Sequence, residues 1–404
     1  MGLTRAKDLH TGAPVWTAHP APMILHEPLF SDQRADVLII GAGVTGAMLA
    51  EELIRAGRSV IILDKRGPLR GSTAATTALM QYDLDLPLIE LAKKLGMDKA
   101  VRAWRRSKLG LESIAGKLAS LGIRCDQVRL PSIYLSGTLL GAEEMRVEQE
   151  LRNSVGLPVD LLGRARLSEE FGMDRPAALV SQENMMVDPI KMVSAMLNIA
   201  LSRGAQLFSP VEVTGIESDQ NGVHALTEGG PVIHADHVVF ATGYELLKYV
   251  SLPQHTLKST YVIATRKQDK SVLPKAMIWE ASTPYLYIRT TIDGRVICGG
   301  EDEDLADARS RDELLTEKTA TLEHKLKAVL DEVDATSEFA WTATFGDSTT
   351  GLPLIGAVPG IPNCSAVMGF GGNGMIFSQI ATEIISTAIT GGSDLDADLF
   401  ALPK

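Results

Sequence analysis

The stretch "DVLIIGAGVTGAMLAEELIRAGRSVIILD", residues 36–64, decides the fold class of this chain. It contains an aliphatic strand, a glycine turn, a segment of helix length, a break at Gly57 and a second aliphatic strand that ends at Asp64. This order predicts a βαβ unit, in which two parallel strands are joined by a crossover helix. We therefore expect an α/β protein with a Rossmann-like domain that binds a dinucleotide.

Each glycine of the GxGxxG turn has its own geometric task. Gly41 permits the tight turn, Gly43 allows a pyrophosphate to approach the backbone, and Gly46 lets the helix lie close to its strand. The helix N-terminus presents free N–H groups and the positive end of its dipole, so Val44 and Thr45 belong to the predicted phosphate site.

Asp64 stands at the end of the second strand, where a carboxylate can accept hydrogen bonds from a ribose. The following Lys65 and Arg66 could instead hold the 2′-phosphate of NADP, although Asp64 would repel that group. The turn by itself does not distinguish FAD from NAD.

Length and charge limit the classes of function. The 404 residues allow two or three domains, and the formal net charge of -11 argues against a nucleic-acid partner. The basic cluster Arg102, Arg105, Arg106 and Lys108 is expected to be a solvated helix face.

The cysteines and the first 30 residues predict the compartment. Cys125, Cys298 and Cys364 lack metal-ligand or CxxC spacing, so we expect free thiols and no metal site. The first 30 residues mix charges and prolines without the apolar run of a signal peptide, and no segment is apolar enough to cross a membrane. We expect a cytoplasmic protein with no membrane association.

Further motifs follow in a fixed order along the chain. They are "RGSTAATTALMQ" (70–81), "VEVTGIES" (211–218), "HADHVVFATGYE" (234–245), "YLYIRTTIDGRVICGGED" (285–302), "GLPLIG" (351–356) and "GFGGNG" (369–374). The last loop precedes apolar positions at helical spacing from Phe377 to Ala388, so it feeds a buried helix. His234 and His237 lie in a predicted strand and, with no further ligands near them in sequence, are expected to be ordinary strand residues.

In this order the motifs resemble the D-amino-acid-oxidase-like family of FAD-dependent oxidoreductases, which includes glycine oxidase, sarcosine oxidase and γ-glutamylputrescine oxidase. The resemblance extends from Asp36 to about Ile389. It implies FAD, and non-covalent FAD, because Ala343 occupies the place of the cysteine that attaches the flavin in sarcosine-oxidase-like members.

The resemblance also assigns cofactor contacts. Ser72 and Thr73 would lie by the pyrophosphate and ribityl chain, and Val211 would offer its backbone to the adenine. The remaining contacts would be Thr77, Ala78 and Leu79 along the flavin ring, Ala241, Thr242 and Gly243 over the phosphates, and Gly369, Gly371, Gly372, Asn373, Gly374 and Met375 at the N1 and C2 carbonyl end of the ring.

Two domains, each made of separate segments, follow from the same resemblance. After an N-terminal arm (1–30), the Rossmann-like FAD-binding domain would comprise residues 31–84, 186–246 and 346–404. An α+β substrate domain on a mainly antiparallel sheet would comprise residues 85–185 and 247–345. Local patterns agree, since 87–121 shows helical spacing and 284–300 reads as two strands around an Asp293-Gly294 turn.

The substrate pocket is predicted from one strand of that sheet. Tyr285, Tyr287 and Arg289 alternate and so project from one face, which we expect to form a pocket wall unless it is an exposed sheet face. Tyr244 and Gln81 are further pocket candidates, whereas Trp279 and Trp341 are expected in the core.

Two departures from the family pattern concern the substrate. Amino-acid-oxidising members carry an arginine six residues before the GLP motif and another directly before Asn-Gly, but this chain has Phe345 and Gly372 there. Because a bidentate arginine is the natural clamp for a carboxylate, a simple α-amino acid held in the usual way is in doubt.

The expected activity is oxidation of a C–N bond in an amine or N-substituted amino acid, with oxygen or another electron acceptor. No catalytic acid or base is assigned, because a neutral amine needs none. Two alternatives stay open at this point: a flavoprotein electron-transfer subunit of a larger complex, and an NAD(P)-linked dehydrogenase.

Overall fold

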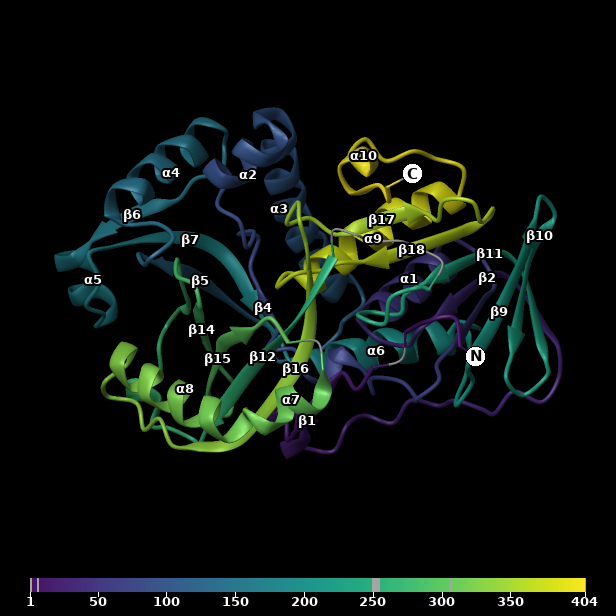
Figure 1. Ribbon diagram of the computed structural model, residues 1–404, viewed down its shortest axis with the longest axis horizontal. Coiled ribbons are helices and arrows are strands. Elements are labelled where there is room, and N and C mark those ends of the chain that lie inside the picture. Colours follow the sequence, from purple (N-terminus) through teal and green to yellow (C-terminus); the bar gives the residue numbers. More distant parts are fainter. Residues whose placement is uncertain (1, 6, 249–254, 306, 404) are drawn as a thin grey trace.

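The computed structural model describes residues 2–5, 7–248, 255–305 and 307–403. Its strands form two sheets that meet near the middle of the molecule (Figure 1). The sheet that contains β2, β11 and β18 lies on the right of Figure 1, and the other sheet lies on the left with α4, α5 and α8.

The first sheet carries the predicted βαβ unit. Its order is β17-β18-β11-β2-β3-β8, and β10 pairs with both β11 and β9. Its strands are β2 (Gln33–Ile40), β3 (Val60–Leu63), β8 (Gln206–Phe208), β9 (Val213–Asp219), β10 (Gly222–Thr227), β11 (Val232–Phe240), β17 (Leu354–Ala357) and β18 (Cys364–Met368). The pairs of β2 with β3 and β11, of β3 with β8, and of β11 with β18 are parallel.

Burial explains why the central strands are continuously aliphatic. Val37, Leu38 and Ile39 have no exposed surface, because helices cover the parallel sheet. The helices of this part are α1 (Val44–Arg55), α6 (Pro189–Ser202), α9 (Gly374–Ile389) and α10 (Ala397–Phe400), and α1 contacts both α6 and α9. The predicted βαβ unit and the helix after the C-terminal glycine loop are therefore confirmed.

The second sheet has ten strands and is mainly antiparallel. Its order is β1-β16-β12-β15-β14-β13-β5-β7-β4, with β6 paired to β7, and among the described strands its one parallel pair is β5 with β13. The strands are β1 (His10–Gly12), β4 (Leu79–Met80), β5 (Val128–Leu135), β6 (Asp160–Gly163), β7 (Ala177–Met186), β12 (His255–Thr265), β13 (Met277–Glu280), β14 (Leu286–Thr290), β15 (Val296–Glu303) and β16 (Ser337–Ser348).

Helices flank this second sheet. The remaining helices are α2 (Leu88–Leu95), α3 (Met97–Ser120), α4 (Ala142–Ser154), α5 (Arg164–Phe171), α7 (Ala308–Glu313) and α8 (Leu315–Val329). Of these, α4 and α5 contact β6 and β7, α8 contacts β12, β15 and β16, and α3 packs on α2 and on α9 of the first part. Short 3₁₀ turns cover Val15–Ala18, Ser72–Ala74 and Lys270–Val272. The predicted fold class, a Rossmann-like α/β part with a second part on a mainly antiparallel sheet, is confirmed, whereas the residue limits given above for the two domains remain a prediction.

The N-terminal arm contacts both sheets. β1 pairs with the outer edge of β16, and the Leu3 N–H donates to the Val213 carbonyl of the first sheet. The indole N–H of Trp16 donates to the Thr76 carbonyl at 2.8 Å. These bonds place residues that precede the βαβ unit beside segments far along the chain.

The basic cluster on α3 differs from the sequence prediction. Arg106 is only 8% exposed, and its guanidinium binds Glu383 at 2.7 Å and Asp394 at 2.9 Å. Arg102 pairs with Asp396 at 3.1 Å. The prediction of a solvated face was wrong for Arg106, whereas Arg105 is exposed and Arg102 is half-buried. The acidic partners lie almost 300 positions away and leave no local signal.

Candidate functional site

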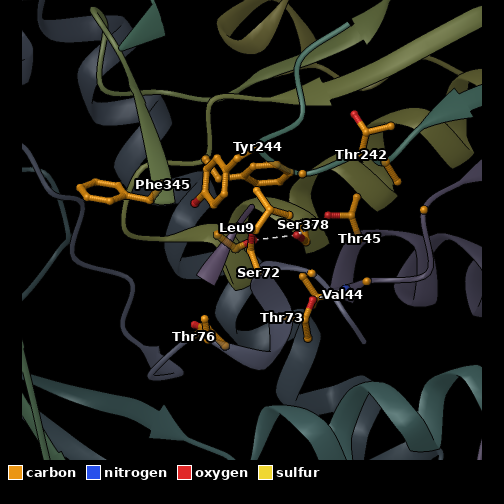
Figure 2. Close-up of a pocket in the computed structure, with 18 of the residues that line it drawn as sticks. Leu9, Val44, Thr45, Ser72, Thr73, Thr76, Thr242, Tyr244, Phe345 and Ser378 are labelled. Atoms are coloured by element: carbon orange, nitrogen blue, oxygen red, sulfur yellow. Dashed lines mark hydrogen bonds between the residues drawn. The ribbon is translucent and has the colours of Figure 1, made fainter. Parts of the chain in front are cut away.

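A cavity lies where the two sheets meet. Its walls include Ile40, Leu63 and Phe240 at the carboxyl ends of β2, β3 and β11, which is where ligands bind in parallel α/β sheets. In Figure 2, Phe345 of β16 stands at one end of the labelled set and Thr242 at the other, with Tyr244 between them. The cavity is therefore elongated and takes side chains from both sheets.

The glycine turn shapes one wall of the cavity. Gly41 has a φ of +118°, and a Cβ on Gly43 would lie 3.0 Å from Thr73 Oγ1. The N-cap residue Gly43 has no side chain to cap α1, and among the first N–H groups of the helix the Val44 N–H donates to Thr73 Oγ1 at 3.0 Å. The other N–H groups of the first turn and the helix dipole make this end of α1 an anion site.

The acid at the end of β3 first stabilises the turn. Asp64 Oδ2 accepts the Ala42 N–H at 2.8 Å, and Oδ1 accepts the N–H groups of Arg66 at 2.8 Å and Gly67 at 3.0 Å. A carboxylate has about four acceptor positions, so these bonds leave about one position for a ribose hydroxyl.

Glu245 neutralises the two cations that follow Asp64. Its buried carboxylate pairs with Lys65 and Arg66 and accepts the Thr4 hydroxyl and the Lys7 N–H at 3.0 Å each. Burial opposes its ionisation, but these donors lower the pKa of Glu245. Lys65 and Arg66 are thus occupied, which removes support for an NADP 2′-phosphate site.

The C-terminal glycine loop forms the opposite wall. Gly371 has a φ of +55°, and its carbonyl accepts the Tyr244 hydroxyl at 3.2 Å. The Asn373 side chain donates to the Asp83 carbonyl at 2.9 Å instead of capping α9. Ser378 on α9 and Thr45 on α1 join by a 2.8 Å hydrogen bond, so two uncapped helix N-termini border one cavity.

Aromatic rings from the second sheet cover the remaining side. Tyr285 and Tyr287 of the β14 region have ring centroids 5.7 Å apart, and the Tyr287 hydroxyl lies 3.3 Å from Thr260 Oγ1. The Tyr287 ring lies over Gly299, where a Cβ would come within 2.4 Å of it. Burial raises the pKa of both tyrosines above the ordinary value, so they stay neutral hydroxyls.

Carboxylates accompany these rings. Asp85 lines the cavity, and its Oδ2 accepts the Gly372 N–H at 2.7 Å. Surrounding protein atoms raise the pKa of Asp85 to about 6, with Asp347 adding to the effect and the Gly372 N–H opposing it. Burial likewise raises the pKa of Asp302 to about 7.

The sequence profile of one family, described as FAD dependent oxidoreductase, matches residues 36–387. The chain belongs to this FAD-dependent oxidoreductase family. The predicted family is thereby confirmed, and an NAD(P)-linked dehydrogenase is no longer a candidate.

Relatives agree with this assignment across most of their length. The chain is 24% identical to γ-glutamylputrescine oxidoreductase of Escherichia coli, over 89% of this chain and 84% of that protein. It is 23% identical to glycine oxidase of Geobacillus kaustophilus, over 88% of this chain and 93% of that protein. Similar solved structures include that same glycine oxidase (TM-score 0.74, 21% identity, 92% and 99% of the two chains) and L-proline dehydrogenase from P. horikoshii (TM-score 0.77, 18% identity, 92% and 97%), which show the shared fold.

The residues present fit FAD, the cofactor that the family implies. The uncapped N-termini of α1 and α9 supply free N–H donors at two places on one elongated cavity. The Ser72 hydroxyl is buried, lines the cavity and has no hydrogen-bond partner among the described residues. The glycines of the turn have no side chains, so a phosphate can approach the backbone there.

The structure brings nearly all predicted site residues around this cavity, and their contacts with FAD stay a prediction. Those that line it are Gly41, Gly43, Val44, Thr45, Asp64, Lys65, Arg66, Ser72, Thr73, Thr77, Ala78, Leu79, Gln81, Val211, Ala241, Thr242, Gly243, Tyr244, Tyr285, Tyr287, Gly371, Gly372, Asn373, Gly374 and Met375. Gly46, Gly369 and Arg289 are not part of the wall. Gly46 instead contacts the Gly41 carbonyl, as its predicted packing task requires.

Arg289 departs from the predicted pocket wall. It is 2% exposed, and its Nη1 donates to the carbonyls of Thr77 at 3.0 Å, Ala78 at 2.9 Å and Val187 at 2.8 Å. Burial lowers the pKa of Arg289 to about 9. The side chain therefore positions the backbone of a cavity-lining segment from behind, and is not available to a substrate.

Trp279 and Trp341 are both buried in the core, as predicted, but Trp279 also reaches the cavity. Trp341 is fully buried, as a core residue should be. Trp279 is 6% exposed and stacks on Tyr134 at 3.8 Å between centroids, but it also lines the cavity, because its strand β13 lies beside β14.

Sequence reasoning missed several residues of the wall. They are Asp85, Glu245, Thr260, Trp279 and, from the arm, Leu3, Thr4 and Leu9. Unpaired cations at Lys65 and Arg66 signal the need for a carboxylate, but no local pattern says that Glu245 supplies it. No helix among the described residues is long and apolar enough to span a membrane.

Proposed function

We propose that this flavoenzyme oxidises a C–N bond of an amine or N-substituted amino acid to an imine, which water hydrolyses to a carbonyl compound and an amine. The observation that carries the proposal is the aromatic and hydroxyl cover formed by Tyr285, Tyr287 and Thr260 beside the C-terminal glycine loop. Relatives whose printed names refer to glycine and γ-glutamylputrescine support a nitrogen-containing substrate.

The cavity walls suggest how FAD would be held. We assign the pyrophosphate to the turn Gly41–Thr45 and the hydroxyls of Ser72 and Thr73, and the flavin ring to the segment Thr77–Leu79. The N-terminus of α9 would face the N1 and C2 carbonyl side of the ring, where its positive dipole end favours negative charge. When bound, FAD supplies the acceptor for the hydride that leaves the substrate carbon.

The protein's own part in the reaction is to position the substrate and exclude water. Tyr285, Tyr287 and Phe345 present rings that would hold the carbon beside the nitrogen in a dry space. Ala343, which also lines the cavity, has no group that could bond to a cofactor, which supports non-covalent binding. The residue limits of an FAD-binding and a substrate domain belong to the same proposal.

An anaerobic screen tests this function. The purified protein with bound flavin is mixed with alkylamines, diamines, amino acids and N-methyl amino acids, and the absorbance of oxidised flavin near 450 nm is followed. We expect bleaching by one of these classes and restoration of the absorbance by oxygen or an artificial acceptor. No bleaching by any amine, together with stable co-purification of another chain, would instead favour the electron-transfer subunit.

A further inference from the structure

The charged residues along the cavity indicate whether the substrate is positively or negatively charged. Among the described residues that line it, the Lys and Arg side chains are Lys65 and Arg66, and both are paired with Glu245 at the glycine-turn end. A substrate carboxylate would therefore find no free cationic side chain on these walls. The carboxylate of an amino acid bound in the cavity would have no cationic side chain to pair with.

A carboxylate occupies the substrate end instead. Asp85 is exposed, and the surface that it exposes faces the cavity. Its hydrogen-bond partner is the Gly372 N–H, and it makes no ion pair with any described residue. A Cβ on Gly372 would lie 2.7 Å from Asp85 Oδ1, so the absence of a side chain at 372 is what leaves room for this carboxylate.

Two neighbouring carboxylates add to the negative charge at this end of the cavity. Asp302 Oδ1 is buried without a hydrogen-bond partner, whereas Asp347 is balanced by Lys258 at 3.3 Å. Lys258 makes its ion pairs with Asp347 and Asp304 and acts on Asp85 and Asp302 only from a greater distance, so the three carboxylates Asp85, Asp302 and Asp347 share one nearby cation. Such a site gains electrostatic energy when a cation enters it.

The surrounding rings suit the same kind of ligand. Trp279, Tyr285, Tyr287 and Tyr244 line the cavity with Asp85, and aromatic faces attract ammonium groups. Trp279 is 6% exposed, and its indole N–H has no acceptor among the described residues. Rings together with an unpaired carboxylate resemble, in chemical terms, the sites that hold alkylated ammonium groups.

We infer that the substrate is an alkylamine or diamine without a carboxylate beside its nitrogen, and that a positively charged nitrogen of this substrate binds Asp85. In a diamine this is the nitrogen that is not oxidised; in a monoamine the bound nitrogen releases its proton to water before the hydride leaves the neighbouring carbon. This inference rests on the proposed amine oxidation and narrows it. Amino acids, which the proposed function also allows, become poor substrates.

Two probes with the same tert-butyl body and opposite charge test the inference without turnover. The tert-butylammonium ion and pivalate share a tert-butyl body, and neither has a hydrogen on the carbon that bears its charged group, so neither can be oxidised there. Each is titrated into the flavin-loaded protein while the flavin absorption spectrum is recorded. We expect tert-butylammonium to bind at least about tenfold more tightly than pivalate.

Matched variants locate the site. Asp85→Asn keeps an acceptor for the Gly372 N–H but removes the charge, and should weaken tert-butylammonium at least about tenfold with flavin content unchanged. Asp160→Asn makes the same chemical change on an exposed side chain of β6, away from the cavity, and should leave binding as it is. Pivalate binding as tightly as tert-butylammonium, or Asp85→Asn binding the cation like the parent, would overturn the inference.

The two proposals fail in different ways. If amino acids bleach the flavin and Asp85→Asn leaves cation binding unchanged, the proposed C–N oxidation is supported and the preference for cationic amines is refuted. If no amine bleaches the flavin but tert-butylammonium binds through Asp85, the cation site stands and the oxidation falls.

Discussion

Substituting Gly46 by alanine tests the geometry of the glycine turn most directly. A Cβ on Gly46 would lie 1.9 Å from the Gly41 carbonyl oxygen, 3.0 Å from its carbon and 3.4 Å from Ile39 Cγ2. The two atoms that this Cβ would meet first belong to the Gly41 backbone, so no side-chain rotation relieves the contact. The start of α1 must move away from β2, which displaces the N–H groups of the predicted pyrophosphate site.

The expected cost follows from two opposing effects. Alanine gains up to about 1 kcal/mol over glycine inside a helix, whereas forcing a methyl group into a packed interior costs about 1–3 kcal/mol, and more where backbone must shift. We expect a net loss of at least about 2 kcal/mol, a Tm lower by about 2 °C or more for a chain of this size, and purified protein with less than half of its flavin.

Gly116→Ala is the matched control. Gly116 lies within α3, and a Cβ there would meet no atom within 4 Å. That variant should keep full flavin and the parent Tm or a slightly higher one. Absorbance at 450 nm relative to 280 nm gives the flavin content, and a thermal melt gives the Tm. A Gly46→Ala protein with full flavin and an unchanged Tm would refute the close helix-to-turn contact.

Two further changes test charged groups behind the cavity. Arg289→Met leaves three main-chain carbonyls without their shared donor, so it should lower the free energy of unfolding by at least about 2 kcal/mol and speed FAD loss on dialysis. The same change at Arg309, whose side chain is 88% exposed, is the control. Equal FAD retention by the two variants would contradict the positioning role. Asp302→Asn should raise the Tm at pH 8 by about 1 °C and by less at pH 5. The pKa of Asp302 rises from 3.8 to about 7 in the folded protein, so this carboxyl lowers stability progressively as pH rises from about 4 to about 7, and only part of that loss is present at pH 5. A gain that is the same at both pH values would show that ionisation of Asp302 is not the cause.

Local sequence was sufficient for the elements that build the cofactor wall. The βαβ unit is encoded within 29 consecutive residues, and strand burial, glycine turn and helix all depend on neighbours in that stretch. Motif order then identified the family, and through it the distant loop at Gly371–Gly374 that forms the opposite wall. Recognition of the family was needed there, because a glycine-rich loop alone equally fits a tight structural turn.

Long-range partners were beyond the reach of the same reasoning. Asp85 is an unremarkable acid in the sequence, and its position against Gly372 joins residues 287 positions apart. Glu245 and the arm residues Thr4 and Lys7 meet only because the arm folds back across the first sheet. Such long-range pairings determine the net charge of a site. The cofactor could therefore be predicted from the sequence, whereas the charge of the substrate could not.

The strand at residues 285–289 illustrates both what the local sequence predicts and what it leaves open. Period-two geometry places Tyr285, Tyr287 and Arg289 on one face of a strand, and the two tyrosines do reach the cavity. Two residues further along, the same face passes behind the segment Thr77–Ala78, whose carbonyls need donors because Ala78 has a φ of +55° and lies outside regular pairing on that side. A buried arginine satisfies those carbonyls. Alternation therefore predicts correctly the face from which a side chain projects. Whether that side chain reaches a ligand or the backbone behind the cavity depends on the tertiary packing, which alternation does not give.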